Sequence, residues 1–159
     1  MEPSPGTAGG EARATILIAD DEPALRALVA EVLGHLGYRV LAAATGDEAW
    51  RIVREQRPDL VLLDIKMPGL SGIEVCRQMR AQPPTRRIPV IMVTGLDARQ
   101  ALEESLIAGA DDFLGKPIDA LELSVRVRSL LRVRNIQDEE QRLEAYIRSL
   151  QALRAPATK

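Results

Sequence analysis

Charged and hydroxyl side chains stand at the ends of the apolar runs of this chain. These residues are Asp20, Asp21, Asp64, Thr94 and Lys116. A carboxylate at the end of a buried strand is costly unless a cation pairs with it. If the carboxyl ends of the strands meet at one edge of a sheet, three carboxylates converge there, and a hard divalent ion such as Mg²⁺ would relieve their repulsion. The spacing therefore predicts a magnesium site beside a lysine and a threonine.

Such a group of residues has the parts of a phosphoryl-acceptor site. Asp64 would supply the attacking oxygen, while the metal ion and Lys116 would neutralise the transferring oxygens. Thr94 would then donate a hydrogen bond to the phosphoryl group after transfer. The competing interpretation, in which each acid merely caps a helix or ends a strand, is adequate for any one of these residues. It does not explain the whole set, so we favour a chemical site.

The elements that must position these residues alternate along the chain. Short apolar runs predict five strands, at residues 15–20, 38–44, 60–64, 88–95 and 111–117. The segments between them carry apolar residues three and four positions apart, which is typical of amphipathic helices. This alternation indicates an α/β fold with a parallel sheet covered on both faces. Ligands of a doubly wound sheet bind beyond the carboxyl ends of the strands, where the polar residues lie.

Four motifs, in this order and spacing, resemble the receiver domain of two-component response regulators. The motifs are ILIADDEP, LVLLDIKMPGLSG, IPVIMVTG and GADDFLGKP, and the resemblance covers residues 14–131. It implies a flavodoxin-like, doubly wound sheet of five parallel strands in the order 2-1-3-4-5. It also implies that Asp64 accepts a phosphoryl group from a histidine kinase or a phosphotransfer protein, and that the chain is a signalling module and not an enzyme.

The same resemblance implies roles for individual residues around Asp64. The Mg²⁺ ligands would be the carboxylates of Asp20, Asp21 and Asp64 and the backbone carbonyl of Lys66. Lys116 would contact the phosphoryl group, and its bond to Pro117 would be cis, as X-Pro energetics permit. Thr94 and Phe113 occupy the switch positions, at which the hydroxyl moves toward the phosphoryl group and the ring turns inward.

The side chains of Lys66 and Leu96 fall where this family tunes the attack of water on the acyl phosphate. Neither side chain is well suited to orient a water molecule, so the sequence predicts a fairly long-lived phosphoryl form.

The composition narrows the remaining classes of function. The 159 residues carry a net charge of -2 with acids and bases mixed along the chain, so no basic field predicts direct binding to nucleic acid. The single Cys76 excludes an internal disulfide, and the N-terminal segment has no apolar stretch that could enter a membrane. We therefore expect a cytoplasmic protein without a membrane segment, and a disordered tail at residues 1–13.

The helical pattern continues beyond the fifth strand. No Gly or Pro interrupts residues 132–154 and helix formers dominate, so we expect one continuous extension of the fifth helix, then a short tail at residues 155–159. Five apolar residues of the extension fit a and d positions of a heptad: Val133, Ile136, Leu143, Ile147 and Leu150. This pattern favours a two-stranded coiled coil, and a solvated helix held by i,i+4 ion pairs is the alternative.

We expect the signal to leave through the fourth and fifth helices, by homodimerisation or by contact with another protein. Leu121 and Val125 would form an outward apolar patch on the fifth helix. Alternatively, the chain is the N-terminal part of a longer regulator, because RVRSLLRVRN resembles linkers that join receivers to diguanylate cyclase or phosphodiesterase domains. A haloacid-dehalogenase-like phosphatase would need a second aspartate where Lys66 stands. A flavodoxin-like redox carrier would need a hydroxyl-rich phosphate loop after the first strand, which is missing.

Overall fold

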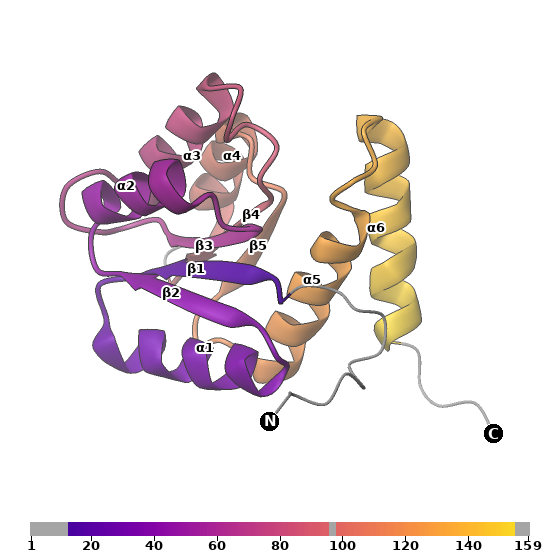
Figure 1. Cartoon of the computed structure of the whole chain (residues 1–159), viewed down its shortest axis with the longest axis horizontal. Coiled ribbons are helices and arrows are strands. Elements are labelled where there is room, and N and C mark those ends of the chain that lie inside the picture. Colours follow the sequence, from indigo (N-terminus) through magenta and orange to yellow (C-terminus); the bar gives the residue numbers. More distant parts are fainter. Residues whose placement is uncertain (1–12, 96–97, 155–159) are drawn as a thin grey trace, which may run out of the picture.

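The fold is a five-stranded parallel sheet between two layers of helices, as the sequence predicts (Figure 1). The computed structural model describes residues 13–95 and 98–154, so Leu96, the first twelve residues of the tail expected at residues 1–13, and the tail expected at residues 155–159 lie outside the described residues. The strands are β1 (Thr15–Ala19), β2 (Arg39–Ala43), β3 (Leu60–Asp64), β4 (Val90–Thr94) and β5 (Asp112–Gly115). Their order in the sheet is β2-β1-β3-β4-β5, which confirms the predicted topology.

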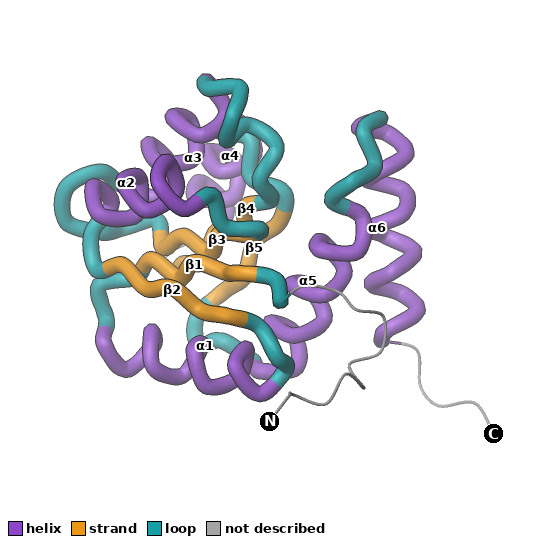
Figure 2. Tube along the Cα trace, viewed as in Figure 1, coloured by secondary structure: helices purple, strands orange, loops and turns teal. Residues whose placement is uncertain are grey.

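In the described parts of the chain, six helices connect and follow the strands (Figure 2). They are α1 (Pro23–His35), α2 (Gly46–Gln56), α3 (Gly72–Ala81), α4 (Ala98–Ala108), α5 (Ala120–Val133) and α6 (Glu139–Arg154). Helices α1 and α5 cover one face of the sheet, and α2, α3 and α4 cover the other (Figure 1). Within the described parts of the chain, no helix is both long enough and apolar enough to cross a bilayer.

The two faces of the sheet are built from alternate residues of each strand. In β3, for example, Val61 and Leu63 pack with α2 and α3, whereas Leu60 and Leu62 pack with α1 and α5. Successive side chains of a strand point to opposite faces, so a strand covered on both sides must be apolar throughout. This is why β3 is fully buried up to Asp64, which is its last residue.

The prediction of one continuous helix beyond the sheet is wrong. Helix α5 ends at Val133, the chain reverses through residues 134–138, and α6 runs back beside α5 (Figure 1). The side chain of Asp138 accepts a hydrogen bond of 2.9 Å from the backbone N–H of Gln141 and so caps the start of α6. Ile136, in the turn, packs against the core that α1 and α5 share. Burial of apolar surface against α5 outweighs the helix propensity of the turn.

Contacts between α6 and the domain are both apolar and polar. Tyr146 is only 5% exposed, and its hydroxyl donates a hydrogen bond to Oδ2 of Asp112 at the start of β5. The hydroxyls of Ser149 and Ser129 lie 3.0 Å apart. Helix α6 is therefore docked on the domain by a buried aromatic ring and by hydrogen bonds to β5 and α5.

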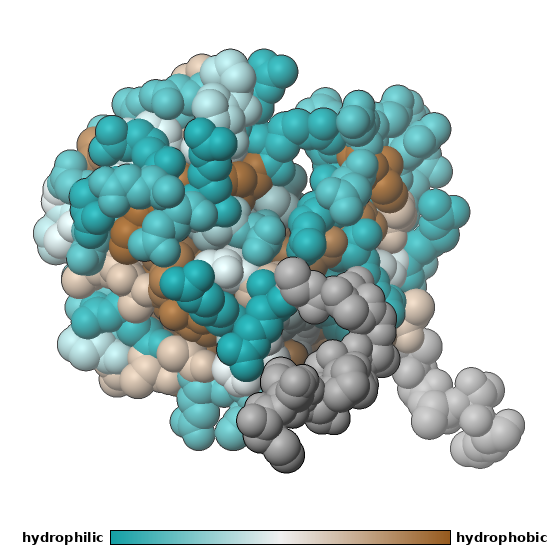
Figure 3. All heavy atoms as spheres, in the orientation of Figure 1, coloured by the Kyte–Doolittle hydropathy of each residue, from teal (hydrophilic) through white to brown (hydrophobic). Residues whose placement is uncertain are grey.

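Docking of α6 divides the predicted heptad stripe. Val133, Ile136 and Leu150 pack in the core, whereas Leu143 and Ile147 on α6 are 57% and 46% exposed. The stripe therefore does not form one face of a single helix, and the structure contradicts the predicted coiled-coil geometry. Hydrophobic atoms remain visible among hydrophilic ones on the α6 side of the molecule (Figure 3).

Only one of the two residues of the outward apolar patch predicted on α5 is exposed. Leu121 is 71% exposed, but Val125 is buried.

Candidate functional site

Adjacent parallel strands bring the predicted carboxylates together. Ala19 of β1 pairs with Leu63 of β3, so the residues that follow them, Asp20 and Asp64, reach the same edge of the sheet. One carboxylate oxygen from each of Asp20, Asp21 and Asp64 lies within 4.8 Å of the others. The three acids therefore form the single cluster that the strand-end spacing predicts.

Lys116 lies at the centre of this acidic edge. Its Nζ atom is 2.9 Å from Oδ2 of Asp20 and 3.2 Å from Oδ2 of Asp64. It also donates a hydrogen bond of 3.0 Å to Oε1 of Glu22, a residue that sequence reasoning missed although it directly follows the two aspartates. The peptide bond between Lys116 and Pro117 is cis.

The acidic edge carries more negative charge than one lysine can neutralise. Burial, and then the charge of Asp20, raise the pKa of Asp64 to about 6, although Lys116 opposes both effects. Burial tends to lower the pKa of Lys116, but its close contacts with the carboxylates of Asp20 and Glu22 and the charge of Asp64 raise it overall. At neutral pH the site is therefore an anionic cluster around one ammonium group.

The chemistry of this donor set fits a hard divalent cation. Asp20 is completely buried, and its Oδ2 atom has the ion pair with Lys116 but no hydrogen bond among the described residues. Clustered carboxylate oxygens of this kind are the ligands that Mg²⁺ prefers in proteins. The backbone N–H of Lys66 donates a 3.3 Å hydrogen bond to Oδ1 of Asp64, so this residue also borders the site.

The loop after β3 holds Asp64 in place through a close backbone approach. A Cβ atom on Gly72 would lie 2.2 Å from the backbone carbonyl oxygen of Asp64, which leaves room only for glycine. The N–H of Gly72 donates a hydrogen bond of 2.9 Å to the carbonyl of Ile65, and the side chain and backbone of Ser71 exchange hydrogen bonds with Glu74 in a capping box. The turn and the start of α3 thus fix the end of β3.

The two predicted switch residues lie on neighbouring strands. Thr94 ends β4, is nearly completely buried and pairs in register with Gly115 of β5. Phe113 pairs with Met92 and packs, partly buried, against the core on the side of α2, α3 and α4. The structure therefore places Thr94 at the acidic edge and Phe113 two residues back along β5.

A carboxylate beside a cation site, faced by a lysine, is the arrangement of a phosphoryl acceptor on a doubly wound α/β domain. The sequence matches the response regulator receiver domain over residues 16–128, so the chain belongs to this family. Receiver domains are signalling modules. The match favours this reading over a phosphatase or a redox carrier.

Relatives of this chain are response regulators. The response regulator PleD of Caulobacter vibrioides is 40% identical over 147 residues, which cover 92% of this chain and 32% of PleD. The phosphate regulon regulator PhoB of Rhizobium meliloti is 41% identical over 117 residues, or 74% of this chain and 52% of PhoB. The chain thus spans about a third of the length of PleD and about half of the length of PhoB.

Solved structures agree with the fold. A putative response regulator from Chloroflexus aurantiacus superposes with a TM-score of 0.73 at 34% identity, covering 76% of this chain and 99% of that one. The receiver domain of a sensor histidine kinase from Pseudomonas aeruginosa superposes with a TM-score of 0.66 at 37% identity, covering 71% of this chain and 93% of that one. That structure has a magnesium ion coordinated in its active-site cleft.

Proposed function

We propose that Asp64 accepts a phosphoryl group from a phosphohistidine of a histidine kinase or phosphotransfer protein. The observation that carries this proposal is the cluster of Asp20, Asp21 and Asp64 together with the ammonium group of Lys116, which lies 2.9 Å from Asp20 and 3.2 Å from Asp64. A carboxylate oxygen of Asp64 attacks phosphorus, the bond from phosphorus to the histidine nitrogen breaks, and the nitrogen keeps the electron pair. Lys116 neutralises charge on the transferring oxygens as they move.

A magnesium ion would complete this site. The three carboxylates and the backbone carbonyl of Lys66 would hold it, and it would supply positive charge to the phosphoryl oxygens. The acidic cluster supports this proposal, as does the magnesium-bound receiver from Pseudomonas aeruginosa.

We propose that β5 carries the signal away from Asp64. Thr94 would donate a hydrogen bond to the phosphoryl group, and Phe113 would turn inward in response. The N–H of Phe113 donates a hydrogen bond of 2.7 Å to Oδ1 of Asp112, and Oδ2 of Asp112 accepts from Arg126 of α5 and from Tyr146 of α6. One carboxylate thus joins the switch strand to both C-terminal helices, so a movement of β5 changes the docking of α6.

Release of α6 would then make an output surface available. Its exposed residues Leu143 and Ile147 and the surface of α5 that it covers would pair with a second copy or another protein. In this proposal residues 14–131 are the receiver, residues 132–154 are a helical extension that docks or detaches, and homodimerisation follows phosphorylation.

A second candidate is that the chain is the N-terminal part of a longer regulator with a cyclic di-GMP type of output. The match to PleD extends over 92% of this chain but only 32% of PleD, which favours this possibility. Helix α6 would then lead into the next domain.

Phosphoryl transfer to Asp64 is tested by intact-protein mass spectrometry after incubation with acetyl phosphate, with and without Mg²⁺. We expect one phosphoryl group per chain, only with Mg²⁺, and none in Asp64→Asn. The matched control is Asp47→Asn, which replaces an exposed carboxylate in the first turn of α2 and leaves labelling unchanged. Labelling of Asp64→Asn to the same extent as the parent would overturn the assignment.

A further inference from the structure

The amino ends of the strands carry a second polar site that the proposed function does not use. A cavity of about 680 Å³ lies between the turn and first residues of α6 on one side and the end of α3 with the segment before β4 on the other. Its basic residues are Arg80, Arg86, Arg87, Arg134 and Arg142, and its acidic residues are Asp111 and Glu139. We call it the arginine cavity. We propose that it binds a phosphorylated small molecule of about nucleotide size.

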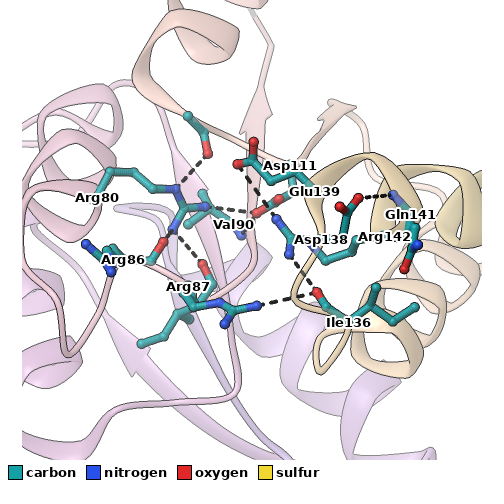
Figure 4. A network of polar contacts seen from close by, with 12 residues as sticks. Arg80, Arg86, Arg87, Val90, Asp111, Ile136, Asp138, Glu139, Gln141 and Arg142 are labelled. Carbon is teal, nitrogen blue, oxygen red and sulfur yellow. Dashed lines mark hydrogen bonds and ion pairs between the residues drawn. The ribbon is translucent and has the colours of Figure 1, made fainter.

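Two of the five arginines are structural. Arg80 donates to the carbonyls of Gly109 and Ile88, at 2.9 and 2.8 Å, and its Nη2 atom is 2.9 Å from Oδ2 of Asp111 (Figure 4). Arg142 donates a hydrogen bond of 2.8 Å to the carbonyl of Ile136. These bonds stabilise the two walls of the cavity. They also leave Arg80 and Arg142 few N–H groups with which to bind a ligand.

The other three arginines keep their charge available. Among the described residues, Arg86, Arg87 and Arg134 form no ion pair; of the two acids of the cavity, Asp111 is paired with Arg80 and Glu139 lies 3.9 Å from Arg142. The side chain of Arg87 donates a long hydrogen bond of 3.4 Å to the carbonyl of Ile136. Three guanidinium groups from two segments of the chain therefore face one cavity whose two acids, Asp111 and Glu139, already lie beside Arg80 and Arg142.

The chemistry of the cavity selects its ligand. Guanidinium groups bind phosphate oxygens in a bidentate manner, and several of them around one site favour a group with more than one negative charge. The N-terminal end of α6, which is the positive end of its dipole, lies at the same cavity. Leu130, Val133 and Leu143 form an apolar part of the cavity wall. The volume falls within the range of about 300–1,000 Å³ that is usual for small-molecule sites and exceeds what one inorganic ion needs.

Such a ligand would also act on α6. Arg87 lies before β4, whereas Arg134 directly follows α5 in the turn that leads to α6, so a phosphate group that contacts both joins this turn to the segment before β4. A ligand that binds only the docked arrangement stabilises it in proportion to its occupancy. A small molecule bound in the arginine cavity would thus stabilise the docked position of α6.

Isothermal titration calorimetry on the unphosphorylated protein tests the proposal. The probes are GTP, ATP and inorganic pyrophosphate, in a chelator that removes divalent ions so that the acidic edge takes no part. We expect a nucleotide to bind with a micromolar dissociation constant, and the double variant Arg87→Ala with Arg134→Ala to weaken it by about tenfold or more. Single replacement Arg86→Ala gives a smaller loss in the same direction.

The matched control is Arg128→Ala with Arg132→Ala, which removes the same charge from exposed positions of α5 outside the cavity. We expect it to weaken binding by less than about twofold, through long-range charge alone. Ligand should also slow hydrogen exchange in α6. Equal losses in the two double variants, no heat with any probe, or binding of an acidic peptide in place of the nucleotides would each overturn the proposal. Asp64→Asn should bind the probes normally, so this test does not depend on phosphorylation.

Discussion

The two ends of the sheet carry opposite charge. At the carboxyl ends of β1 and β3, three carboxylates lie together, two of them pair with one lysine, and an excess of negative charge remains. Toward the amino ends, five arginines and two acids line one cavity and leave an excess of positive charge. The acidic edge is made by residues at strand ends, whereas the arginine cavity is made by a reversal of the chain. The first therefore follows from the order of the strands, and the second depends on where α6 docks.

The largest effect should come from removing the cation of the acidic edge. In Lys116→Ala the transferring oxygens lose their nearest ammonium group, and we expect phosphoryl transfer to slow by about 10²–10³-fold. Lys66→Ala is the matched control, because its exposed side chain is lost while its backbone carbonyl remains. Rates are measured by mass spectrometry with acetyl phosphate. Equal rates in the two variants would show that Lys116 has no role in transfer.

The next largest effect should come from the loop that fixes Asp64. Gly72→Ala places a methyl group against the backbone carbonyl of Asp64, and we expect a loss of about 2–3 kcal/mol in the free energy of unfolding. Gly34→Ala, in α1 with no atom within 4 Å of the new methyl group, should instead stabilise by about 0.5–1 kcal/mol. Urea denaturation of both variants gives the comparison. An unchanged midpoint for Gly72→Ala would contradict the close approach.

Much of the acidic edge is predictable because its residues adjoin strands that the sequence marks clearly. The apolar runs ending at Ala19 and Asp64 locate two strands, and the parallel topology brings their ends together. The part played by Glu22 and Gly72 could not be predicted, because it depends on distances to Lys116 and to the carbonyl of Asp64. Glycines follow Asp64 in the sequence, but only the folded loop shows which one approaches it.

The arginine cavity could not be predicted because the sequence contains no strong helix breaker where the chain reverses. Residues 132–154 favour helix throughout, and the turn is decided by tertiary burial of Ile136 and Tyr146. One local signal was present: Asp138 with Gln141 three residues later is a typical start of a helix. This signal competes with an uninterrupted helical pattern, and the packing of α6 on α5 decides between them.

A smaller effect should follow from loosening α6 alone. Tyr146→Phe removes the hydroxyl that donates to Asp112 and leaves that carboxylate with Arg126, so we expect a loss of about 1 kcal/mol in the free energy of unfolding. Hydrogen exchange in α6 should become faster. The control Ile147→Val trims a half-exposed side chain of the same helix and should leave both properties nearly unchanged. Similar hydrogen exchange of α6 in both variants would contradict a role of the Tyr146 hydroxyl in docking α6.

The smallest effect concerns the charge repulsion at the acidic edge. Asp64→Asn should raise the free energy of unfolding near neutral pH by about 1 kcal/mol. The variant removes the cost of burying the Asp64 charge beside Asp20, but it also loses the attraction between that charge and Lys116. The folded protein holds a proton on Asp64 more tightly than the unfolded chain does. The loss of stability caused by the Asp64 charge is therefore absent below the unfolded pKa of 3.8 and complete above the folded pKa of about 6.

Thermal unfolding of the parent and Asp64→Asn across this pH range, without Mg²⁺, measures the difference. A lower stability of Asp64→Asn near neutral pH would contradict the account of the acidic edge.

The central claim is that phosphorylation of the acidic edge releases α6 through β5. The most direct measurement is hydrogen exchange of α6 with Mg²⁺ alone and then with Mg²⁺ and beryllofluoride, which mimics the phosphoryl group on Asp64. The account predicts faster exchange over residues 139–150 with the mimic in the parent and no change in Asp64→Asn. Equal exchange of α6 in the parent with and without the mimic would contradict it.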